Sequence, residues 1–496
     1  MQTPSRQTGG LRLSRRDAIG AAAVWMATGL LAACGGASST ASASTTASAA
    51  NQTASAASAA VTATSSASAS NAATAPATST APTTQPSTTA SATVAASTSQ
   101  PAAPAGTLTY WAVAGKGDSS YDAWVQRLAD FNKAHPTSQA TMEAPADLNT
   151  KLAASVAGGT PPNVAGQDRY TIAASSAKSL MQDIAALANQ AGIKGDDEQP
   201  WCWQEVSIKG KLYGLPYSTD TRMIYMNVNH LQKAGIPSTA PKTLDDFTQI
   251  GQQLTIKQGG SLQQLGFVPW NDNWVPYGFG WLYGGSFYDP DKNQATLADP
   301  KIVAAFEWAG GVAKQLGYQA VQDFYKARQG NPFITQVQSS YINSTSFLIT
   351  VANAGPSLSW TPWAPPPPQG VDHTSTWSGG FAVVLPTGAK NADLSFELMR
   401  YLSDADLQRI QMKAGRLPTI KAVAADPYWD TVDPRTKQFV QMLPFSHSRP
   451  VTPQVNIMTS ELNNAHTAVL SGQQTAAQAL QAANQIVNTA IQENRV

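Results

Sequence analysis

One short segment combines two large aromatic rings with three polar side chains. Residues 270–274 read Trp-Asn-Asp-Asn-Trp, so Trp270 and Trp274 flank side chains that donate and accept hydrogen bonds. A hydrophobic core rarely accepts three adjacent polar residues between two indoles. Aromatic rings suit the apolar faces of a small molecule, and amide and carboxylate groups suit its polar edge. The segment, with Asp272 at its centre, is therefore predicted to contact a neutral polar ligand.

Further candidates for ligand contact lie where predicted strands end in loops. They combine aromatic rings, planar polar side chains and a pair of glycines through which the backbone can approach a ligand closely. These candidates are Trp111, Gln167, Asp168, Asp220, Arg222, Trp281, Trp363, Trp377, Gly379, Gly380 and Arg416.

Several of these residues also have a purely structural interpretation. Trp281 and Trp377 are equally compatible with a place in the core. Asp168 and Asp220 have the side chain that commonly caps a turn, and Arg416 could either bind a ligand or satisfy the end of a helix. The sequence leaves these alternatives open.

Composition limits the classes of function. The chain has 496 residues and a formal net charge of +1, and its Lys and Arg residues form no cluster. A nucleic-acid-binding surface requires such a cluster, so no nucleic-acid partner is expected. A chain of this length normally divides into two lobes or domains.

No catalytic or metal-binding pattern stands out. The chain lacks His-Glu-x-x-His, Gly-x-Ser-x-Gly and Gly-x-x-x-x-Gly-Lys sequences, and its five His residues are scattered. Neither a metal nor a cofactor is therefore expected. A retaining glycosidase needs two neighbouring carboxylates, but nothing singles out a pair among the candidates. The chain is predicted not to be an enzyme.

The first 34 residues have the organisation of an export signal. A basic region ending at Arg15 and Arg16 precedes an apolar stretch over 18–33, which is shorter than the ~20 residues of a spanning helix. The sequence Ser-Arg-Arg-Asp at 14–17 resembles a twin-arginine signal, although Ala18 replaces the usual bulky apolar residue. Leu-Ala-Ala-Cys at 31–34 resembles the lipobox of bacterial lipoproteins, which predicts a lipid anchor on Cys34, outside the cytoplasm.

The segment that follows is predicted to be a disordered tether. Residues 35–106 are mostly Ala, Ser, Thr and Pro, without charged or aromatic residues, and cannot bury enough apolar surface to fold. Because Cys34 belongs to the export signal, Cys202 is alone in the folded body. No disulfide within the chain is expected, and Cys202 is predicted to be a small buried residue.

Strand and helix patterns alternate in the body of the chain, which favours an α/β architecture with mostly parallel strands. Residues 360–369 contain five prolines and predict a stiff extended connector. Strands are predicted at 107–111, 163–166, 212–216, 223–227 and 381–386, and helices at 121–135, 148–156, 243–254, 393–403, 404–414, 458–470 and 475–493.

The order of these landmarks resembles the extracellular solute-binding proteins of ABC importers, in the family that includes the maltose-type sugar receptors. The resemblance covers about residues 107–490, and each matching segment is short, so the order of the segments carries the assignment. The segments include Phe-Asn-Lys-Ala-His-Pro at 131–136, Gly-Thr-Pro-Pro at 159–162, Lys-Gly-Lys-Leu-Tyr-Gly-Leu-Pro at 209–216, Trp-Ser-Gly-Gly at 377–380 and Gly-Arg-Leu-Pro-Thr at 415–419.

The resemblance implies a two-lobed periplasmic-binding-protein fold of type II, with a hinge and a ligand in the cleft between the lobes. One lobe is expected to comprise 107–218 and 370–418, and the other 219–369 and 419–496. The implied protein is a monomeric receptor that captures a mono- or oligosaccharide and delivers it to the membrane permease of an ABC importer. The alternatives are a receptor for another polar solute, such as glycerol phosphate or a polyamine, and a secreted carbohydrate-active enzyme.

The sequence departs from the family pattern in two places. Asn163 follows Pro162 where the family usually has Asp, which is expected to change only a turn. Between Asp323 and Thr350 the family's usual strand entry is replaced by Asn-Pro-Phe-Ile-Thr-Gln at 331–336, so the strand pairing of this region cannot be predicted.

Overall fold

The computed structural model describes residues 106–496. The predicted export signal with Cys34, and the predicted tether apart from Gly106, lie outside the described residues. Within 106–496, no helix has the length and apolar character needed to cross a membrane.

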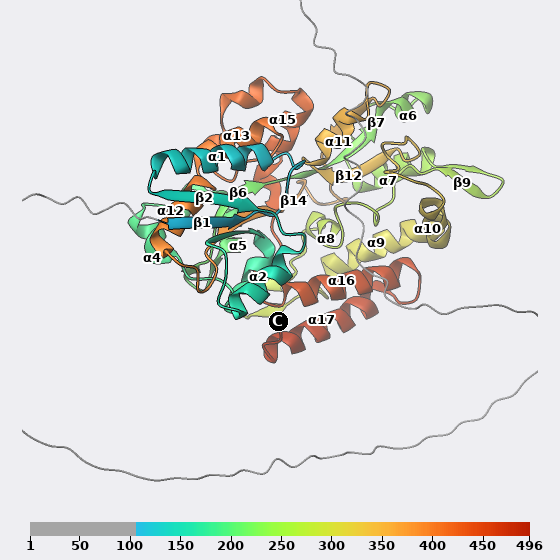
Figure 1. Ribbon diagram of the computed structural model, residues 1–496. Helices are drawn as coiled ribbons and strands as arrows, with labels where there is room; N and C mark the ends of the chain where they lie inside the picture. Colours follow the sequence, from blue (N-terminus) through green and yellow to red (C-terminus); the bar gives the residue numbers. More distant parts are fainter. Residues whose placement is uncertain (1–105) are drawn as a thin grey trace, which may run out of the picture. The chain divides into compact units, whose positions relative to one another are not determined.

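The first of two main sheets has five strands in the order β2-β1-β3-β15-β6. Strand β1 is parallel to β2 and β3, whereas β15 is antiparallel to β3 and β6. Figure 1 shows β1 and β2 between α1 on one side and α2 and α5 on the other. The strands are β1 Gly106–Trp111, β2 Ser138–Glu143, β3 Val164–Asp168, β6 Leu215–Thr219 and β15 Gly380–Val384.

Helices and short elements surround the first sheet. Helix α1 shows why they form, since its buried residues Trp124, Leu128 and Phe131 recur at helical spacing. The elements are α1 Tyr121–Ala134, α2 Leu148–Ala157, η1 Arg169–Thr171, α3 Ile172–Ala177, α4 Ala185–Gln190, η2 Gly195–Asp197, α5 Pro200–Val206, β4 Ser207–Ile208, β5 Lys211–Leu212, α12 Ala392–Tyr401 and α13 Ala405–Lys413.

The second main sheet has three strands in the order β12-β7-β13, and both outer strands are antiparallel to the central β7. In these two main sheets, the prediction of mostly parallel strands is therefore wrong outside β1, β2 and β3, because segments from distant parts of the chain complete both sheets. The strands are β7 Arg222–Asn227, β12 Ser340–Ser344 and β13 Trp360–Trp363. Residues 360–363 of the predicted connector are thus part of a sheet, and β12 resolves the pairing that the sequence left open.

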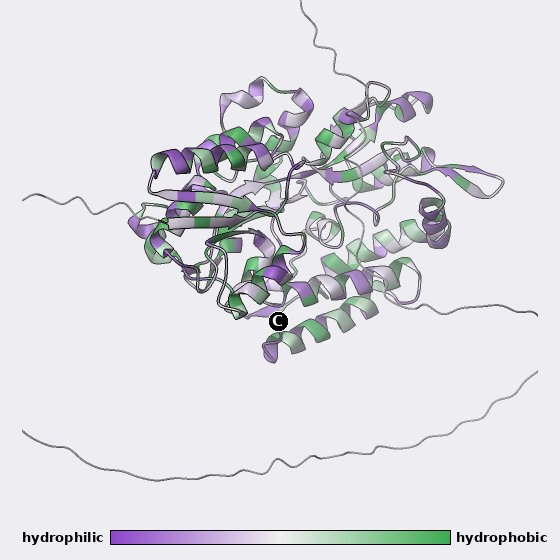
Figure 2. Ribbon diagram, in the orientation of Figure 1, coloured by the Kyte–Doolittle hydropathy of each residue, from purple (hydrophilic) through white to green (hydrophobic). Residues whose placement is uncertain are grey.

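The elements around the second sheet include the long C-terminal helices, which lie beside α9 (Figure 1). Hydrophobic and hydrophilic residues alternate along α17 (Figure 2), whose buried positions follow a helical repeat. The elements are α6 Val228–Lys233, α7 Leu244–Gln253, β8 Ile256–Gln258, β9 Ser261–Gln264, α8 Gly278–Leu282, β10 Tyr288–Asp289, β11 Gln294–Ala295, α9 Pro300–Leu316, α10 Tyr318–Lys326, α11 Phe347–Asn353, α16 Val455–Leu470 and α17 Ala476–Gln492.

Each sheet lies in its own hydrophobic core. Buried residues between 108 and 217, together with residues between 382 and 407, form the first core. Residues between 224 and 377, together with residues between 458 and 491, form the second core. The described residues therefore build two lobes, each from separate stretches of the chain.

A smaller hydrophobic cluster is formed by residues that lie in the sequence between residue 407 of the first core and residue 458 of the second core. Met412, Leu417, Val423 and Trp429 pack together, with Trp201 of α5 against them, so the predicted boundary at residue 418 falls inside this cluster. Its elements are α14 Lys421–Ala424, η3 Pro427–Asp430, α15 Pro434–Gln441 and η4 Leu443–Phe445.

Asn163 does not only change a turn, as predicted, but also connects three segments through hydrogen bonds of its side chain. Its side-chain oxygen accepts a hydrogen bond from Thr109 N–H at 3.1 Å, and its amide donates to the Lys390 carbonyl at 2.9 Å. It therefore joins the loop before β3 to β1 and to the segment before α12.

Candidate functional site

Two short crossings connect the lobes side by side. Strand β6 leads into β7 through Asp220, and β14, Thr376–Trp377, leads into β15 through Gly379. The hydroxyls of Thr219 and Ser378 lie 2.5 Å apart. The Gly379 N–H donates to Asp220 Oδ1 at 2.6 Å. The two crossings are thus hydrogen-bonded into one unit, which forms the hinge.

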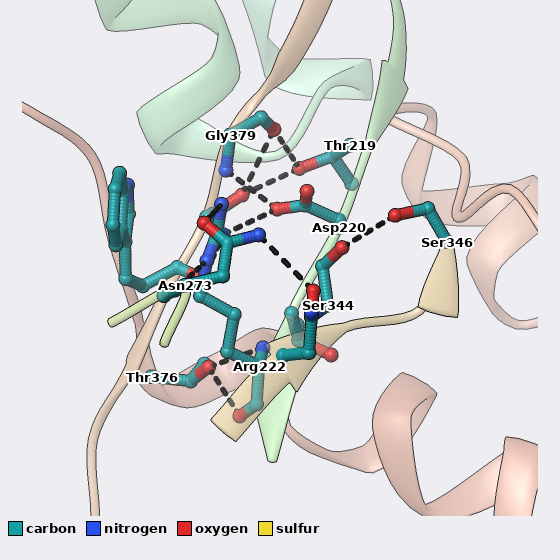
Figure 3. A network of polar contacts seen from close by, with 12 residues as sticks. Thr219, Asp220, Arg222, Asn273, Ser344, Ser346, Thr376 and Gly379 are labelled. Atoms are coloured by element: carbon teal, nitrogen blue, oxygen red, sulfur yellow. Dashed lines mark hydrogen bonds and ion pairs between the residues drawn. The ribbon is translucent and has the colours of Figure 1, made fainter. Parts of the chain in front are cut away.

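The guanidinium of Arg222 joins this hinge to the second lobe (Figure 3). It donates to Asp220 Oδ1 at 2.7 Å, to the Trp377 carbonyl at 2.9 Å and, through Nε, to the Asn273 carbonyl at 2.7 Å. Its Cζ also lies 4.0 Å from the centroid of the Trp377 ring. Burial lowers the pKa of Arg222, and Asp220 opposes that shift. Arg222 therefore binds the protein's own groups and fixes the loop 270–274 to the hinge.

Arg169 holds the same crossings from the first lobe. It is fully buried and forms an ion pair with Glu205 at 2.9 Å. It also donates to the carbonyl oxygens of Ser218 and, at 2.7 Å, of Gly379. Burial raises the pKa of Glu205, and Arg169 opposes that shift. This pair anchors both crossing strands on α5 of the first lobe.

The predicted glycine pair provides room for these guanidiniums. Gly380 has φ +129°, and a Cβ at this position would lie 2.1 Å from the Ser218 carbonyl and 2.3 Å from Arg169 Nη1. The peptide groups of Gly379 are bonded to Asp220 and Arg169. The close approach that only glycine allows is therefore to Arg169 and the neighbouring strand.

Asp168 ends β3 on the first-lobe side of the hinge. It is half-buried, and its carboxylate makes no capping hydrogen bond to the start of η1. Burial raises its pKa, whereas Arg449 and Arg169 act in the opposite direction. Asp168 thus lies among cations from two parts of the chain and still has acceptor capacity to offer.

Arg449 belongs to this site, although sequence analysis missed it. Its guanidinium carbon lies 3.7 Å from the centroid of the Tyr170 ring and 4.7 Å from that of Trp377. Arg449 lies in the segment Ser-His-Ser-Arg-Pro at 446–450, whose first two residues form β16, Ser446–His447, which pairs with β14. No motif marks this arginine, and only the pairing of these distant segments places it beside Asp168.

The two tryptophans of the 270–274 loop belong to different cores. Trp270 packs near Tyr318, at a ring distance of 5.9 Å, and Trp274 packs against Phe279 at the same distance in the second core. Trp274 is fully buried. Both indoles therefore support the loop from inside, and the polar residues between them are its more accessible part.

Asp272 is the least satisfied of those polar residues. Its Oδ1 accepts a hydrogen bond from the Trp274 N–H at 3.1 Å, while Oδ2 is buried without a partner among residues 106–496. Burial raises the pKa of Asp272 well above its ordinary value. The neighbouring Asn273 donates to Asn343 at 3.2 Å (Figure 3). Asp272 thus offers a hydrogen-bond acceptor on the second lobe.

Two other predicted tryptophans have their rings in contact with protein. Trp281 stacks with Tyr277 at 5.2 Å and with His447 at 5.4 Å, and it lies 6.4 Å from Trp377. Trp363 lies in the second core, where its indole N–H donates to the Ser238 carbonyl at 2.9 Å. Trp281 therefore lies beside Trp377 at the hinge. The contacts of Trp363 are those of a core residue.

The remaining candidates lie on the first lobe. Trp111 ends β1, and Lys151 Nζ lies 4.2 Å from its ring centroid. Gln167 donates to Asn149 at 3.2 Å. Arg416 forms an ion pair with Asp118 at 2.9 Å, while its Nε is buried without a partner in the described part of the chain.

The structure thus brings Asp168, Asp220, Arg222, Trp281, Trp377, Gly379 and Gly380 together at the hinge, where both indoles are also buried members of the second core. Trp270, Trp274 and Trp363 point into cores. Residues 106–496 contain no group of three His, Cys, Asp or Glu side chains that could hold a metal ion. Cys202 is free and buried, as predicted.

Solved structures of other proteins share this fold. The structure matches that of CpMnBP1 with mannotriose bound, with a TM-score of 0.66 and 21% identity over 77% of this chain and 99% of that one. It also matches the sugar-binding protein MalE from Xanthomonas citri, with a TM-score of 0.65 and 19% identity over 78% of this chain and 98% of that one. The fold is therefore the two-lobed periplasmic-binding-protein fold.

The sequence assigns the chain to a family within this class. The model of the bacterial extracellular solute-binding protein family matches residues 126–435, and the chain belongs to that family. Its curated relatives include the diacetylchitobiose-binding protein DasA of Streptomyces coelicolor, which is 24% identical over 331 residues, covering 64% of this chain and 75% of DasA.

Proposed function

We propose that this protein is the receptor of an ABC importer and captures a neutral mono- or oligosaccharide between its lobes. The observation that carries the proposal is the mixed set of groups at the hinge, where Asp168 and Arg449 lie together beside the rings of Tyr170 and Trp377. A sugar hydroxyl both donates and accepts hydrogen bonds, so it can use a carboxylate and a guanidinium at once. The rings offer apolar surface to the C–H groups of a sugar.

The names of similar proteins support this ligand class. The matched proteins include a diacetylchitobiose-binding protein and structures solved with mannotriose and with maltotetraose. A polyamine would favour an excess of carboxylates, and glycerol phosphate an excess of cations, whereas Asp168 and Arg449 balance each other.

The proposed protein binds its ligand without breaking a bond. Two carboxylates beside the hinge have structural partners, since Asp220 is bound by Arg222 and Glu205 by Arg169. These paired carboxylates stabilise the crossing strands. Their role favours a receptor whose lobes open and close around the ligand over an enzyme that uses carboxylates for acid–base chemistry.

The first residues support a location outside the cytoplasm for the proposed receptor. The lipobox at 31–34 supports lipid attachment at Cys34, so the protein is proposed to be anchored on the outer face of the membrane and to function as a monomer. Residues 35–106 would then link the anchor to the lobes. The membrane permease of the importer is its proposed partner.

A thermal-shift screen of the purified mature protein tests the ligand class. A ligand at 100 times its dissociation constant adds about 2.7 kcal/mol to the free energy of unfolding, which raises the melting temperature measurably. We expect one class of mono- or oligosaccharide to do so. A rise with polyamines or glycerol phosphates alone would overturn the carbohydrate assignment, and hydrolysis of a sugar by the pure protein would overturn the receptor assignment.

A further inference from the structure

We propose that Arg449 binds the solute directly and, through its contact with Tyr170, couples the filled site to closure of the lobes. This inference rests on the proposed function and assigns a ligand contact and a mechanical role to one side chain.

The position of Arg449 allows it to join the lobes. It lies between β16, which pairs with β14, and α16, which contributes to the second core. Tyr170 lies in η1, directly after the first-lobe strand β3. The stacking of Arg449 on Tyr170, at 3.7 Å, is therefore a contact between the two lobes.

Arg449 differs from the other two guanidiniums of the hinge. Arg169 is paired with Glu205 at 2.9 Å, and Arg222 is paired with Asp220 at 2.7 Å. Arg449 has no ion pair among residues 106–496, and its Nε is buried without a hydrogen-bond partner. A buried donor without an acceptor is unfavourable, so a ligand that supplies an acceptor is preferentially bound here.

The side chains around Arg449 indicate which atoms of the solute it would contact. The indole N–H of Trp377 is also buried without a partner within the described residues, and the two side chains stack at 4.7 Å. Asp168 lies close enough for Arg449 to influence its pKa. A pair of neighbouring hydroxyls can thus accept hydrogen bonds from Arg449 and donate them to Asp168. Such a ligand bridges the first lobe and the segment that carries Arg449.

The experiment compares Arg449→Lys with a matched control, Arg435→Lys. Lys keeps the charge of Arg449 but removes Nε–H and the planar face that stacks on the rings. Arg435 also lies over an indole, with Cζ 4.5 Å from the Trp360 ring, but it is paired with Asp433 away from the hinge. Affinity is measured by calorimetry with the sugar that stabilises the wild type, and closure by the ligand-induced decrease in radius of gyration.

We expect Arg449→Lys to weaken sugar binding at least tenfold and to reduce the closure, while Arg435→Lys changes neither. Tyr170→Leu, which removes the ring, should also weaken binding. This variant gives the same test if Arg449→Lys fails to fold, as judged from the melting temperature without ligand.

Wild-type affinity and closure in both Arg449→Lys and Tyr170→Leu would overturn the inference and leave the proposed function intact. A wild-type protein that binds none of the sugars would overturn the proposed function itself, and with it the role of Arg449.

Discussion

The guanidinium of Arg169 donates a hydrogen bond to the carbonyl oxygen of Gly379 at 2.7 Å, although 210 positions separate the two residues. The same side chain contacts Ser218 of the other crossing strand and Glu205 of α5. A single buried cation thus links both crossings to the first lobe. The integrity of the hinge should therefore depend on this one ion pair.

Arg169→Met should destabilise the protein strongly. The substitution leaves Glu205 buried without its partner, and removing one member of a buried pair typically costs about 3–5 kcal/mol. Urea unfolding at pH 7 measures the change. Arg400→Met is the matched control, because it breaks the exposed pair with Glu397 and should cost less than about 1 kcal/mol. Equal effects of the two substitutions would contradict the proposed importance of the buried pair.

Gly380→Ala and Gly311→Ala should have opposite effects on stability. A Cβ on Gly380 would meet the Ser218 carbonyl at 2.1 Å, and its φ of +129° is unfavourable for alanine. We expect a loss of about 2 kcal/mol or more. Gly311 lies in α9 with no atom within 4 Å of the added Cβ, so alanine there should stabilise by about 0.5–1 kcal/mol. The two unfolding midpoints should therefore shift in opposite directions.

Glu198 should make the stability depend on pH. Burial raises its pKa from 4.5 to about 7, so the folded protein holds this proton more tightly than the unfolded chain. The stabilisation is complete below about pH 4.5 and is lost as the pH rises to about 7. Relative to the wild type, Glu198→Gln should gain stability over this window, by at most about 3 kcal/mol. A difference that is constant from pH 4.5 to 8 would show that Glu198 has an ordinary pKa.

Trp274→Ala should act mainly on folding. The side chain is fully buried, and truncating such a tryptophan typically costs about 3–5 kcal/mol. Unfolding of the ligand-free protein measures this loss. A variant as stable as the wild type, with weaker sugar binding, would instead place the indole in direct contact with the ligand.

Asp168→Asn should act mainly on binding. The amide is nearly the same size as the carboxylate but has one acceptor oxygen and no charge, and a hydrogen bond to a charged group contributes about 1.5–3 kcal/mol. Calorimetry should therefore show an affinity at least tenfold weaker for the sugar that stabilises the wild type. Unchanged affinity would remove Asp168 from the site.

The sequence was sufficient where a local pattern determines the structure. The helix predicted at 243–254 is α7, and the hydroxyl of Thr243 at its start accepts a hydrogen bond from the Asp246 N–H at 3.2 Å. The polar residues of the 270–274 loop were also a useful signal, but the pattern could not show that Trp270 and Trp274 point into different cores. Arg449 was missed because its importance comes from the pairing of β16 with β14, which no local pattern encodes.

Strand β15 lies between β3 and β6 in the first sheet, but the ribosome makes it only after the whole second sheet. Until Val384 has been synthesised, β3 and β6 have no strand between them. The second core also depends on late residues, since Val487 and Ile491 of α17 belong to it. Contacts between such distant segments form slowly. The first core can be completed once residue 407 has been made, whereas the second core must wait for residue 491.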